Sequence, residues 1–410
     1  MRNRRPFRRE HGRLRTRLGV TVLIMAALAV AVAVSAGAQP AKKPPPKKPT
    51  PLAQARAFLK LAYRGSSVLP SPASRPAAKG KNVTIISSGQ NSISSAVPVA
   101  GEMEACAAIG WTCTVYDGKS DPSTWPGLVR QAIAARTDGI ILQAIDCPLI
   151  EQPLREAKAA GIKVVGSYAF DCSDPKFHGE KLFGGQPLYI VPKVIARLQS
   201  KLPKSVKNPT ALGSVSYAYT LGLATIAKTG GAAKVISVSD PEFRIVDYTL
   251  QGFKAGLSTD PKSKIVANVD FLVSELGPAL EAKVSQALLQ HPEANAIRIP
   301  YTAAMLLGGA SAIQKSGRAG KIVVVGTEGF GPELDLIRSG LVSFANITPK
   351  AWIGWAAVDT MNSLFINKPV QNSGLGATLV DKTHGLPATP GAEFDTFPDY
   401  RKAYKKAWGF

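Results

Sequence analysis

The strongest constraint on this chain is a pattern that occurs four times between Lys81 and Asp171. Each time, a short apolar run rich in β-branched residues is followed by a stretch with helical periodicity. The apolar runs are residues 82–91, 112–118, 138–147 and 162–171. Strands that alternate with helices are joined by right-handed crossovers and form a parallel sheet covered on both faces. The pattern therefore predicts a doubly wound α/β lobe.

A second series of the same kind follows later in the chain. Its apolar runs, each followed by a helix-patterned stretch, are residues 234–240, 264–271, 296–302, 321–330 and 341–348. Two series of similar size predict an α/β protein with two Rossmann-like lobes, each built on a parallel sheet. Ligands of such sheets bind beyond the carboxyl ends of the strands. We therefore expect a ligand cleft between the lobes.

The N-terminus has the pattern of an export signal. Arg-rich residues 2–17 precede an apolar run at 18–34 and a small-x-small motif, Ala36-Gly37-Ala38. This predicts a signal peptide at 1–38. An uncleaved membrane anchor is the alternative, because a run of about 17 residues is near the lower limit for a spanning helix. Residues 39–78 are predicted to be a Lys/Pro-rich tether with a short helix and a linker.

The formal charge of +22 is concentrated at the N-terminus. Residues 1–17 hold eight Arg and one Glu, and residues 39–51 hold four Lys, which leaves about +11 for the rest of the chain. No basic motif interleaved with aromatic residues and no zinc-finger spacing accompanies this charge. We therefore expect no nucleic-acid partner.

All four cysteines fall in the first predicted lobe, at Cys106, Cys113, Cys147 and Cys172. An even number in an exported protein favours disulfides, and three pairings are possible. We favour a bond between Cys106, at the end of a helix, and Cys113, at the start of the next strand. We also favour a bond between Cys147 and Cys172, because these residues follow two strands that we expect to be neighbours. A zinc site of four thiolates is the alternative, but no C-x2-C spacing supports it.

The sequence carries no recognisable catalytic motif. It has neither a G-x-x-x-x-G-K-[ST] phosphate loop nor a G-x-S-x-G nucleophile elbow. None of the four histidines has metal-ligand spacing to another His or Cys. We therefore expect a protein that is not an enzyme and has neither a cofactor nor a metal site.

Several stretches, taken together and in order, resemble the type-I periplasmic binding proteins of the ribose- and sugar-binding branch. They include KNVTIISSGQNS, VDYTLQGFKAG, KIVVVGTEGF and SGLVSFANITPKAWIGWAAVDTM, and the resemblance covers roughly residues 80–385. The forms SDPSTW and AIDCP resemble a high-GC Gram-positive, actinobacterial-like subgroup. The resemblance implies two lobes joined by hinge crossings, with the ligand enclosed between them.

The same resemblance implies the domain boundaries. Lobe 1 would comprise residues 79–214 and 347–370, and lobe 2 residues 215–346 and 371–390, with a C-terminal tail at 391–410. The hinges would be crossing strands near residues 212–216, 346–349 and 369–373.

The strand ends and the resemblance together indicate a set of ligand-binding residues. In lobe 1 these are Ser88, Gln90, Asn91, Gln143, Asp146, Tyr168, Phe170 and Asp171. In lobe 2 they are Phe243, Arg244, Phe271, Tyr301, Glu328 and Asn346. Carboxylates and amides bind hydroxyls, and aromatic faces stack on the C–H side of a pyranose. The alternatives are that the aromatic residues only pack and that Asp146 caps a helix.

Ribose-type sites carry two arginines that this chain lacks. The corresponding positions hold Tyr168-Ala169 and Asp247-Tyr248, so we expect Arg244 to compensate.

The resemblance implies a monomeric, exported solute-binding protein, extracellular or associated with the cell envelope. It would capture a sugar or sugar-like polar molecule and deliver it to the permease of an ABC importer. An extracellular sensing module that presents its ligand to a receptor kinase is the alternative. A repressor effector domain is disfavoured by the export signal.

Overall fold

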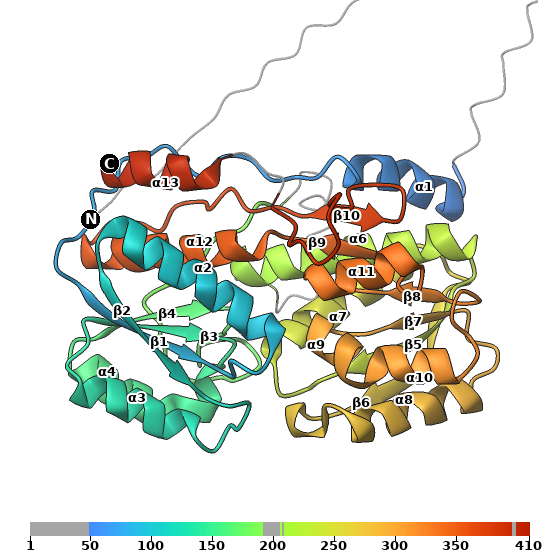
Figure 1. Cartoon of the computed structure of the whole chain (residues 1–410), viewed down its shortest axis with the longest axis horizontal. Helices are drawn as coiled ribbons and strands as arrows, with labels where there is room; N and C mark the ends of the chain where they lie inside the picture. The colour runs from blue at the N-terminus through green and yellow to red at the C-terminus, as the bar shows by residue number, and fades with distance from the viewer. Residues whose placement is uncertain (1–48, 192–205, 207–208, 396–398) are drawn as a thin grey trace, which may run out of the picture. The chain divides into compact units, whose positions relative to one another are not determined.

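The computed structural model describes residues 49–191, 206, 209–395 and 399–410. The predicted signal peptide and the first part of the tether lie outside this range. Residues 49–410 belong to one compact unit (Figure 1). Within the described part of the chain, no helix combines the length and apolar character needed to cross a membrane.

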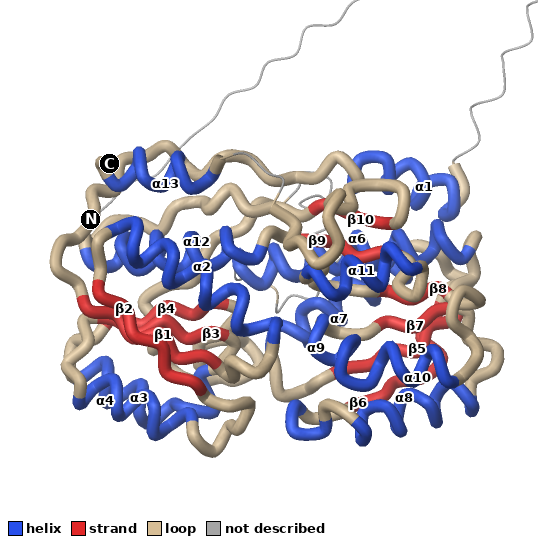
Figure 2. The backbone as a smooth tube through the Cα atoms, viewed as in Figure 1, coloured by secondary structure: helices blue, strands red, loops and turns tan. Residues whose placement is uncertain are grey.

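Lobe 1 is built on a parallel four-stranded sheet of order β2-β1-β3-β4. Its strands are β1 (Asn82–Ser87), β2 (Thr112–Asp117), β3 (Gly139–Gln143) and β4 (Lys163–Ser167). Helices α2 (Ile93–Ile109) and α12 (Lys350–Phe365) cover one face, and α3 (Trp125–Ala134) and α4 (Glu151–Ala159) the other (Figure 2). A short 3₁₀ turn, η1 (Cys147–Ile150), precedes α4. Every residue of β3 is buried, as expected for a strand covered on both faces.

Lobe 2 is built on a six-stranded sheet of order β10-β9-β8-β7-β5-β6. All neighbouring strands are parallel except β10, which runs antiparallel to β9. The strands are β5 (Lys234–Ser239), β6 (Lys264–Asp270), β7 (Ala296–Arg298), β8 (Val323–Val325), β9 (Phe344–Ile347) and β10 (Thr378–Asp381). The sequence-based prediction of an α/β fold with two parallel sheets is therefore confirmed.

Helices cover both faces of the second sheet. On one face lie α6 (Pro209–Thr229) and α7 (Arg244–Leu257), and on the other α8 (Pro278–Gln290), α10 (Ala310–Lys315) and α11 (Gly331–Ser339). The short segments η3 (Val273–Glu275), α9 (Thr302–Ala304) and η4 (Met305–Gly309) connect strands to helices. The hydrophobic clusters on the two faces form the core of this lobe.

The chain passes between the lobes after β9. Strand β9 belongs to lobe 2, but α12, which begins three residues later, packs on α2 and β4 of lobe 1. The expectation of an extended crossing at residues 212–216 is wrong, because these residues lie in the first turns of α6. There α6 contacts α7 closely: a Cβ added to Gly252 would lie 2.1 Å from the Val215 carbonyl oxygen.

A segment that follows the first helix runs alongside parts of the chain that are far away in sequence. Helix α1 (Pro51–Ala62) packs on α6, and residues 66–77, which we call the strap, then run along later parts of the chain. The strap's backbone N–H groups donate to carbonyls in residues 372–377 and 407–408. Arg75 of the strap also forms a buried ion pair with Asp359 of α12 at 2.8 Å. The strap is thus part of the compact unit.

The C-terminal tail contains one more helix, α13 (Tyr400–Trp408). Its aromatic side chains pack on Trp352 and Trp355 of α12. Helix α13 therefore covers lobe 1 from outside, next to the strap (Figure 1).

Both favoured disulfide pairings are confirmed. Cys106 near the end of α2 is bonded to Cys113 in β2. Cys147, just beyond β3, is bonded to Cys172, beyond β4. The second bond ties together two loops at the carboxyl edge of the lobe 1 sheet.

Candidate functional site

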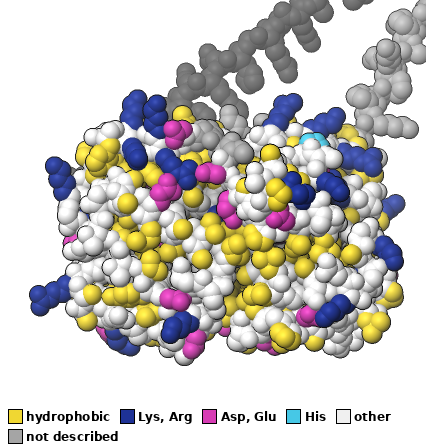
Figure 3. All heavy atoms as spheres, in the orientation of Figure 1, with side chains coloured by type: hydrophobic (Ala, Val, Ile, Leu, Met, Phe, Trp, Pro, Cys, Tyr) yellow, Lys and Arg dark blue, Asp and Glu magenta, His cyan; other side chains and the backbone are white. Residues whose placement is uncertain are grey.

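A cavity of about 340 Å³ opens between the lobes. Residues just beyond the carboxyl ends of β1, β3 and β4 line it from lobe 1, and residues beyond β7, β8 and β9 from lobe 2. On the face of the molecule in Figure 3, hydrophobic side chains gather around the middle, where the lobes meet. The cavity therefore lies where a doubly wound fold places its ligands.

Two of the lining residues have an uncommon backbone conformation. Ala144 follows β3 with φ 55°, and Tyr168 follows β4 with φ 54°. The left-handed region is uncommon for residues other than glycine and a clear outlier for a bulky one. Such strain persists only where the surroundings enforce it, and it concentrates at functional sites.

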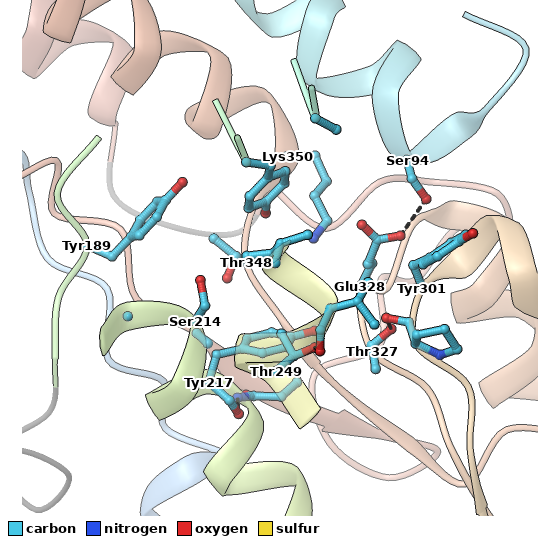
Figure 4. Close-up of a pocket in the computed structure, with 18 of the residues that line it drawn as sticks. Ser94, Tyr189, Ser214, Tyr217, Thr249, Tyr301, Thr327, Glu328, Thr348 and Lys350 are labelled. Atoms are coloured by element: carbon cyan, nitrogen blue, oxygen red, sulfur yellow. Dashed lines mark hydrogen bonds between the residues drawn. The ribbon is translucent and has the colours of Figure 1, made fainter. Parts of the chain in front are cut away.

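Glu328, which follows β8, is the carboxylate of the cavity. One of its oxygens, Oε2, accepts hydrogen bonds from the Ser94 hydroxyl at 2.5 Å and from the Thr302 backbone N–H at 2.8 Å. Ser94 belongs to lobe 1, so this contact spans the cleft (Figure 4). Among the described residues, none donates to the other oxygen, Oε1. Burial raises the pKa of Glu328, whereas the charge of Lys350 lowers it.

Lys350, the first residue of α12, is the cation of the cavity. Its side chain is 5% exposed, and its ammonium lies 5.0 Å from the centroid of the Phe330 ring. Within the described part of the chain, this ammonium has neither a hydrogen bond nor an ion pair. Burial lowers its pKa, against the opposing effect of Glu328. Figure 4 shows the Lys350 and Glu328 side chains approaching the same part of the cavity.

Sequence reasoning missed Lys350. The available signal was its position directly after the crossing segment, in Asn346-Ile-Thr-Pro-Lys350. A residue that follows a crossing lies at the junction of the lobes. Glu328 and Lys350 are the charged side chains of the cavity wall, as far as the described residues show.

Hydroxyl groups and aromatic rings make up much of the remaining wall. The hydroxyls come from both lobes and include those of Ser88, Ser92, Ser94, Ser120, Ser214, Thr249, Thr327 and Thr348. Tyr301 donates its hydroxyl to Asp240 at 2.8 Å, and its ring contacts those of Phe243 and Phe271. Burial raises the pKa of Asp240 to about 7. The wall thus offers small polar groups set among apolar faces.

Six of the residues predicted from the sequence line the cavity: Ser88, Tyr168, Phe243, Tyr301, Glu328 and Asn346. The Asn346 amide donates to the Tyr217 carbonyl at 2.8 Å, and the Ser88 hydroxyl bonds that of Ser95 at 2.8 Å. The structure thus brings these six residues together from both lobes.

Asp146 and Arg244 join the lobes but are not among the residues that line the cavity. Asp146 of lobe 1 accepts from the backbone N–H groups of Phe170 and Arg244, both at 2.7 Å. Burial raises the pKa of Asp146 to about 7. The Arg244 guanidinium donates to Asp174 of lobe 1 at 2.8 Å, and Asp174 also accepts from the Tyr248 hydroxyl at 2.5 Å. We call Asp174, Arg244 and Tyr248 the interlobe latch.

The other predicted residues lie behind or beside the cavity. Asp171 accepts from three backbone N–H groups and so shapes its own loop. Gln143 is fully buried, and its side-chain amide has no hydrogen-bond partner in the described structure. Phe170 and Phe271 are buried in hydrophobic clusters. The last two, Gln90 and Asn91, bond to residues of lobe 1, Ser87 and Ser120.

Comparison with known proteins agrees with this architecture. Residues 213–369 match a family model described as a periplasmic binding protein domain. A search of curated protein sequences gave no match.

Solved structures of ABC transporter solute-binding proteins are similar along most of the chain. One from Mycobacterium smegmatis, with bound glycerol, has a TM-score of 0.60 at 18% identity and covers 76% of this chain and 99% of its own. One from Agrobacterium vitis, bound with α-D-tagatopyranose, has a TM-score of 0.58 at 19% identity, and the match covers 74% of this chain and 95% of that protein. A 5-methylthioribose transporter protein from Thermotoga lettingae has a TM-score of 0.59 at 15% identity and covers 83% and 99%.

At these identities the structural matches establish the fold, and the family model adds an independent sequence match to the second half of the chain. The chain therefore has the two-lobed fold of these solute-binding proteins, and residues 213–369 match the family model of a periplasmic binding protein domain.

Proposed function

We propose that this chain is an exported solute-binding protein that captures a sugar or sugar-like polyol between its lobes and delivers it to the permease of an ABC importer. The observation that carries the proposal is that a carboxylate, Glu328, and an ammonium group, Lys350, line the same interlobe cavity. Each has hydrogen-bonding capacity that no described residue uses, and hydroxyl groups from both lobes surround them.

A vicinal diol suits this pair. A hydroxyl group both donates and accepts, so one hydroxyl can donate to Oε1 of Glu328 while its neighbour accepts from the Lys350 ammonium. Aromatic walls such as Tyr168 and Tyr301 can cover the C–H faces of the same molecule. Since only the closed arrangement contacts both sides of the ligand, binding would favour closure.

The comparisons support the ligand class. The similar solved proteins are described with bound glycerol, tagatopyranose and 5-methylthioribose, all of which carry neighbouring hydroxyls. In this role the protein binds and releases its ligand unchanged, acts as a monomer and works outside the cytoplasmic membrane.

A thermal-shift screen tests the proposal. The chain from residue 39, which contains the whole compact unit of 49–410, would be screened against sugars, polyols, nucleosides and amino acids. A ligand at 100 times its Kd adds about 2.7 kcal/mol to the stability of the folded state and raises Tm. We expect a shift with a hydroxylated ligand that is lost in Glu328→Gln and in Lys350→Met.

Glu293→Gln is the matched control, because Glu293 is a surface carboxylate outside the cavity. It should keep the full shift. The proposal fails if no hydroxylated compound shifts Tm, or if Glu328→Gln responds like the control.

A further inference from the structure

The cavity continues beyond the space between the lobes. From Glu328 and Lys350 it extends past Tyr217 and Thr220 on α6 and reaches helix α1. We call this extension the α1 branch. Its apolar lining residues are Phe58, Leu61, Ala62, Ile190, Leu375 and Ala377. A ligand bound at Glu328 thus has a continuous space beside it that leads toward α1.

The polarity of the wall differs between the two ends. Both charged side chains lie at the interlobe end, whereas the described residues of the α1 branch carry no charge. Leu375 is fully buried there, and Leu61 is 55% exposed, so the branch reaches the surface near Leu61. The interlobe end suits hydroxyl groups, and the α1 branch suits an apolar group.

The wall of the α1 branch is firmly held. The Thr50 hydroxyl caps α1 by accepting from the Ala53 N–H at 3.2 Å, and the Phe58 ring contacts the Tyr219 ring at 6.4 Å between centroids. At the other end of the helix, the Tyr63 hydroxyl donates to Asp381 at 2.6 Å. The contacts with Tyr219 and Asp381 fix α1 on lobe 2, so the branch is a built part of the cavity.

We infer that the ligand has two chemically different ends, a hydroxylated group held by Glu328 and Lys350 and an apolar substituent that occupies the α1 branch. A glycoside with an alkyl or aryl aglycone belongs to this class, whereas a free monosaccharide fills only part of the space. The inference rests on the proposed function, since it takes the hydroxylated end as given. Each methylene buried in the branch is worth about 0.8 kcal/mol, or about a fourfold gain in affinity.

Titration calorimetry on the chain from residue 39 tests the inference. The probes are glucose, galactose, xylose and ribose, each as the free sugar, the methyl glycoside and the butyl glycoside. For the sugar that binds, we expect affinity to rise from free sugar to methyl to butyl glycoside, by about fourfold for each methylene that becomes buried.

Two variants locate the apolar end. Leu61→Ser and Ile190→Ser should each lower the ratio of butyl-glycoside affinity to free-sugar affinity, and Leu61→Ser remains informative if Ile190→Ser does not fold. The control is Leu289→Ser, because Leu289 is an exposed leucine of α8 outside the cavity. It should leave the ratio unchanged.

The outcomes separate the two proposals. If a free sugar binds in a Glu328-dependent manner but its glycosides bind no more tightly, the two-ended ligand is wrong and the proposed function stands. An unchanged ratio in both branch variants also overturns it. If neither these sugars nor their glycosides bind, the inference of a glycoside ligand is overturned, and the thermal-shift screen alone decides the proposed function.

Discussion

Glu102 on α2 is a buried carboxylate outside the cavity wall. It is fully buried, and neither of its oxygens has a hydrogen-bond partner in the described structure. Burial raises its pKa from 4.5 to about 8, against the opposing effect of the nearby Ser167 hydroxyl. An ionised carboxylate at this position would be costly, so the folded protein holds a proton there that the unfolded chain releases at neutral pH.

This predicts a pH-dependent stability. Because the folded-state pKa is above the unfolded value, the folded state binds more protons between pH 4.5 and 8. Stability from this group is therefore highest below about pH 4.5 and falls as pH rises to about 8. Glu102→Gln should flatten this dependence and gain roughly a few kcal/mol at pH 8, with little change at pH 4. Urea unfolding of both proteins at a series of pH values between 4 and 8 measures this difference in the free energy of unfolding.

Glu104→Gln is the control on the same helix. Glu104 is paired with Arg401 at 2.7 Å, and its pKa is lowered overall because the hydrogen bond and charge of Arg401 outweigh the effect of burial. Its replacement should bring no gain at pH 8. Equal behaviour of the two variants would contradict the assignment of a buried proton to Glu102.

At the scale of elements, α13 is held by ring stacking on α12. The Trp408 ring stacks on Trp355 with centroids 5.4 Å apart, and the Tyr400 ring stacks on Trp352 at 4.5 Å. The Trp408 indole N–H also donates to Asp359 at 2.8 Å, the carboxylate that pairs with Arg75. Helix α13 is therefore a structural part of lobe 1.

Removal of the Trp408 ring should weaken the whole fold. We expect Trp408→Ala to cost about 3–5 kcal/mol in the free energy of unfolding, as for other buried large side chains. Chemical denaturation followed by circular dichroism measures the loss. Phe410→Ala, two residues later and 67% exposed, should stay within about 0.5 kcal/mol of the original protein. A Trp408→Ala protein of unchanged stability would show that α13 does not support lobe 1.

At the scale of the whole molecule, the interlobe latch connects the lobes outside the cavity wall. The side chains of Arg244 and Asp174 are 5% and 1% exposed, and Lys176 pairs with Asp247 beside them. Separation of the lobes requires these bonds to break. We therefore expect the latch to hold the lobes together even without a ligand.

Asp174→Asn should shift the protein toward an open arrangement. Loss of the Asp174 charge leaves the buried Arg244 guanidinium with the more distant Asp247 carboxylate at 3.3 Å, at a cost of up to about 3–5 kcal/mol, and opening relieves this cost by exposing Arg244 to water. Small-angle X-ray scattering should show a larger radius of gyration without ligand and a return to the original value with saturating ligand.

Glu156→Gln removes a carboxylate from an exposed ion pair with Arg130. It should leave the radius of gyration unchanged both without and with ligand. A ligand-free radius of gyration that is identical in Asp174→Asn and the original protein would argue against the latch.

The sheet architecture could be predicted because strand and helix periods alternate over long stretches. The disulfides could be predicted because their cysteines follow strands and helices that lie next to each other in such a fold. Helix α13 could not be predicted from the sequence, because its aromatic residues are buried only through their packing against the tryptophans of α12. Lys350 and Arg244 show the same limit. Lys350 lines the cavity, whereas Arg244 bonds to Asp174. These positions depend on how the two lobes pack together, which the local sequence does not encode.

The strap has a consequence for the order in which the protein can be completed. Residues 66–77 leave the ribosome long before their hydrogen-bond partners, residues 372–377 and 407–408. A nascent chain can form its first sheet while this segment still lacks its partners. The strap can therefore form all of these hydrogen bonds only after residue 408 has left the ribosome. A chain that stops before residue 407 would leave the backbone N–H groups of Arg75 and Ala77 without these partners.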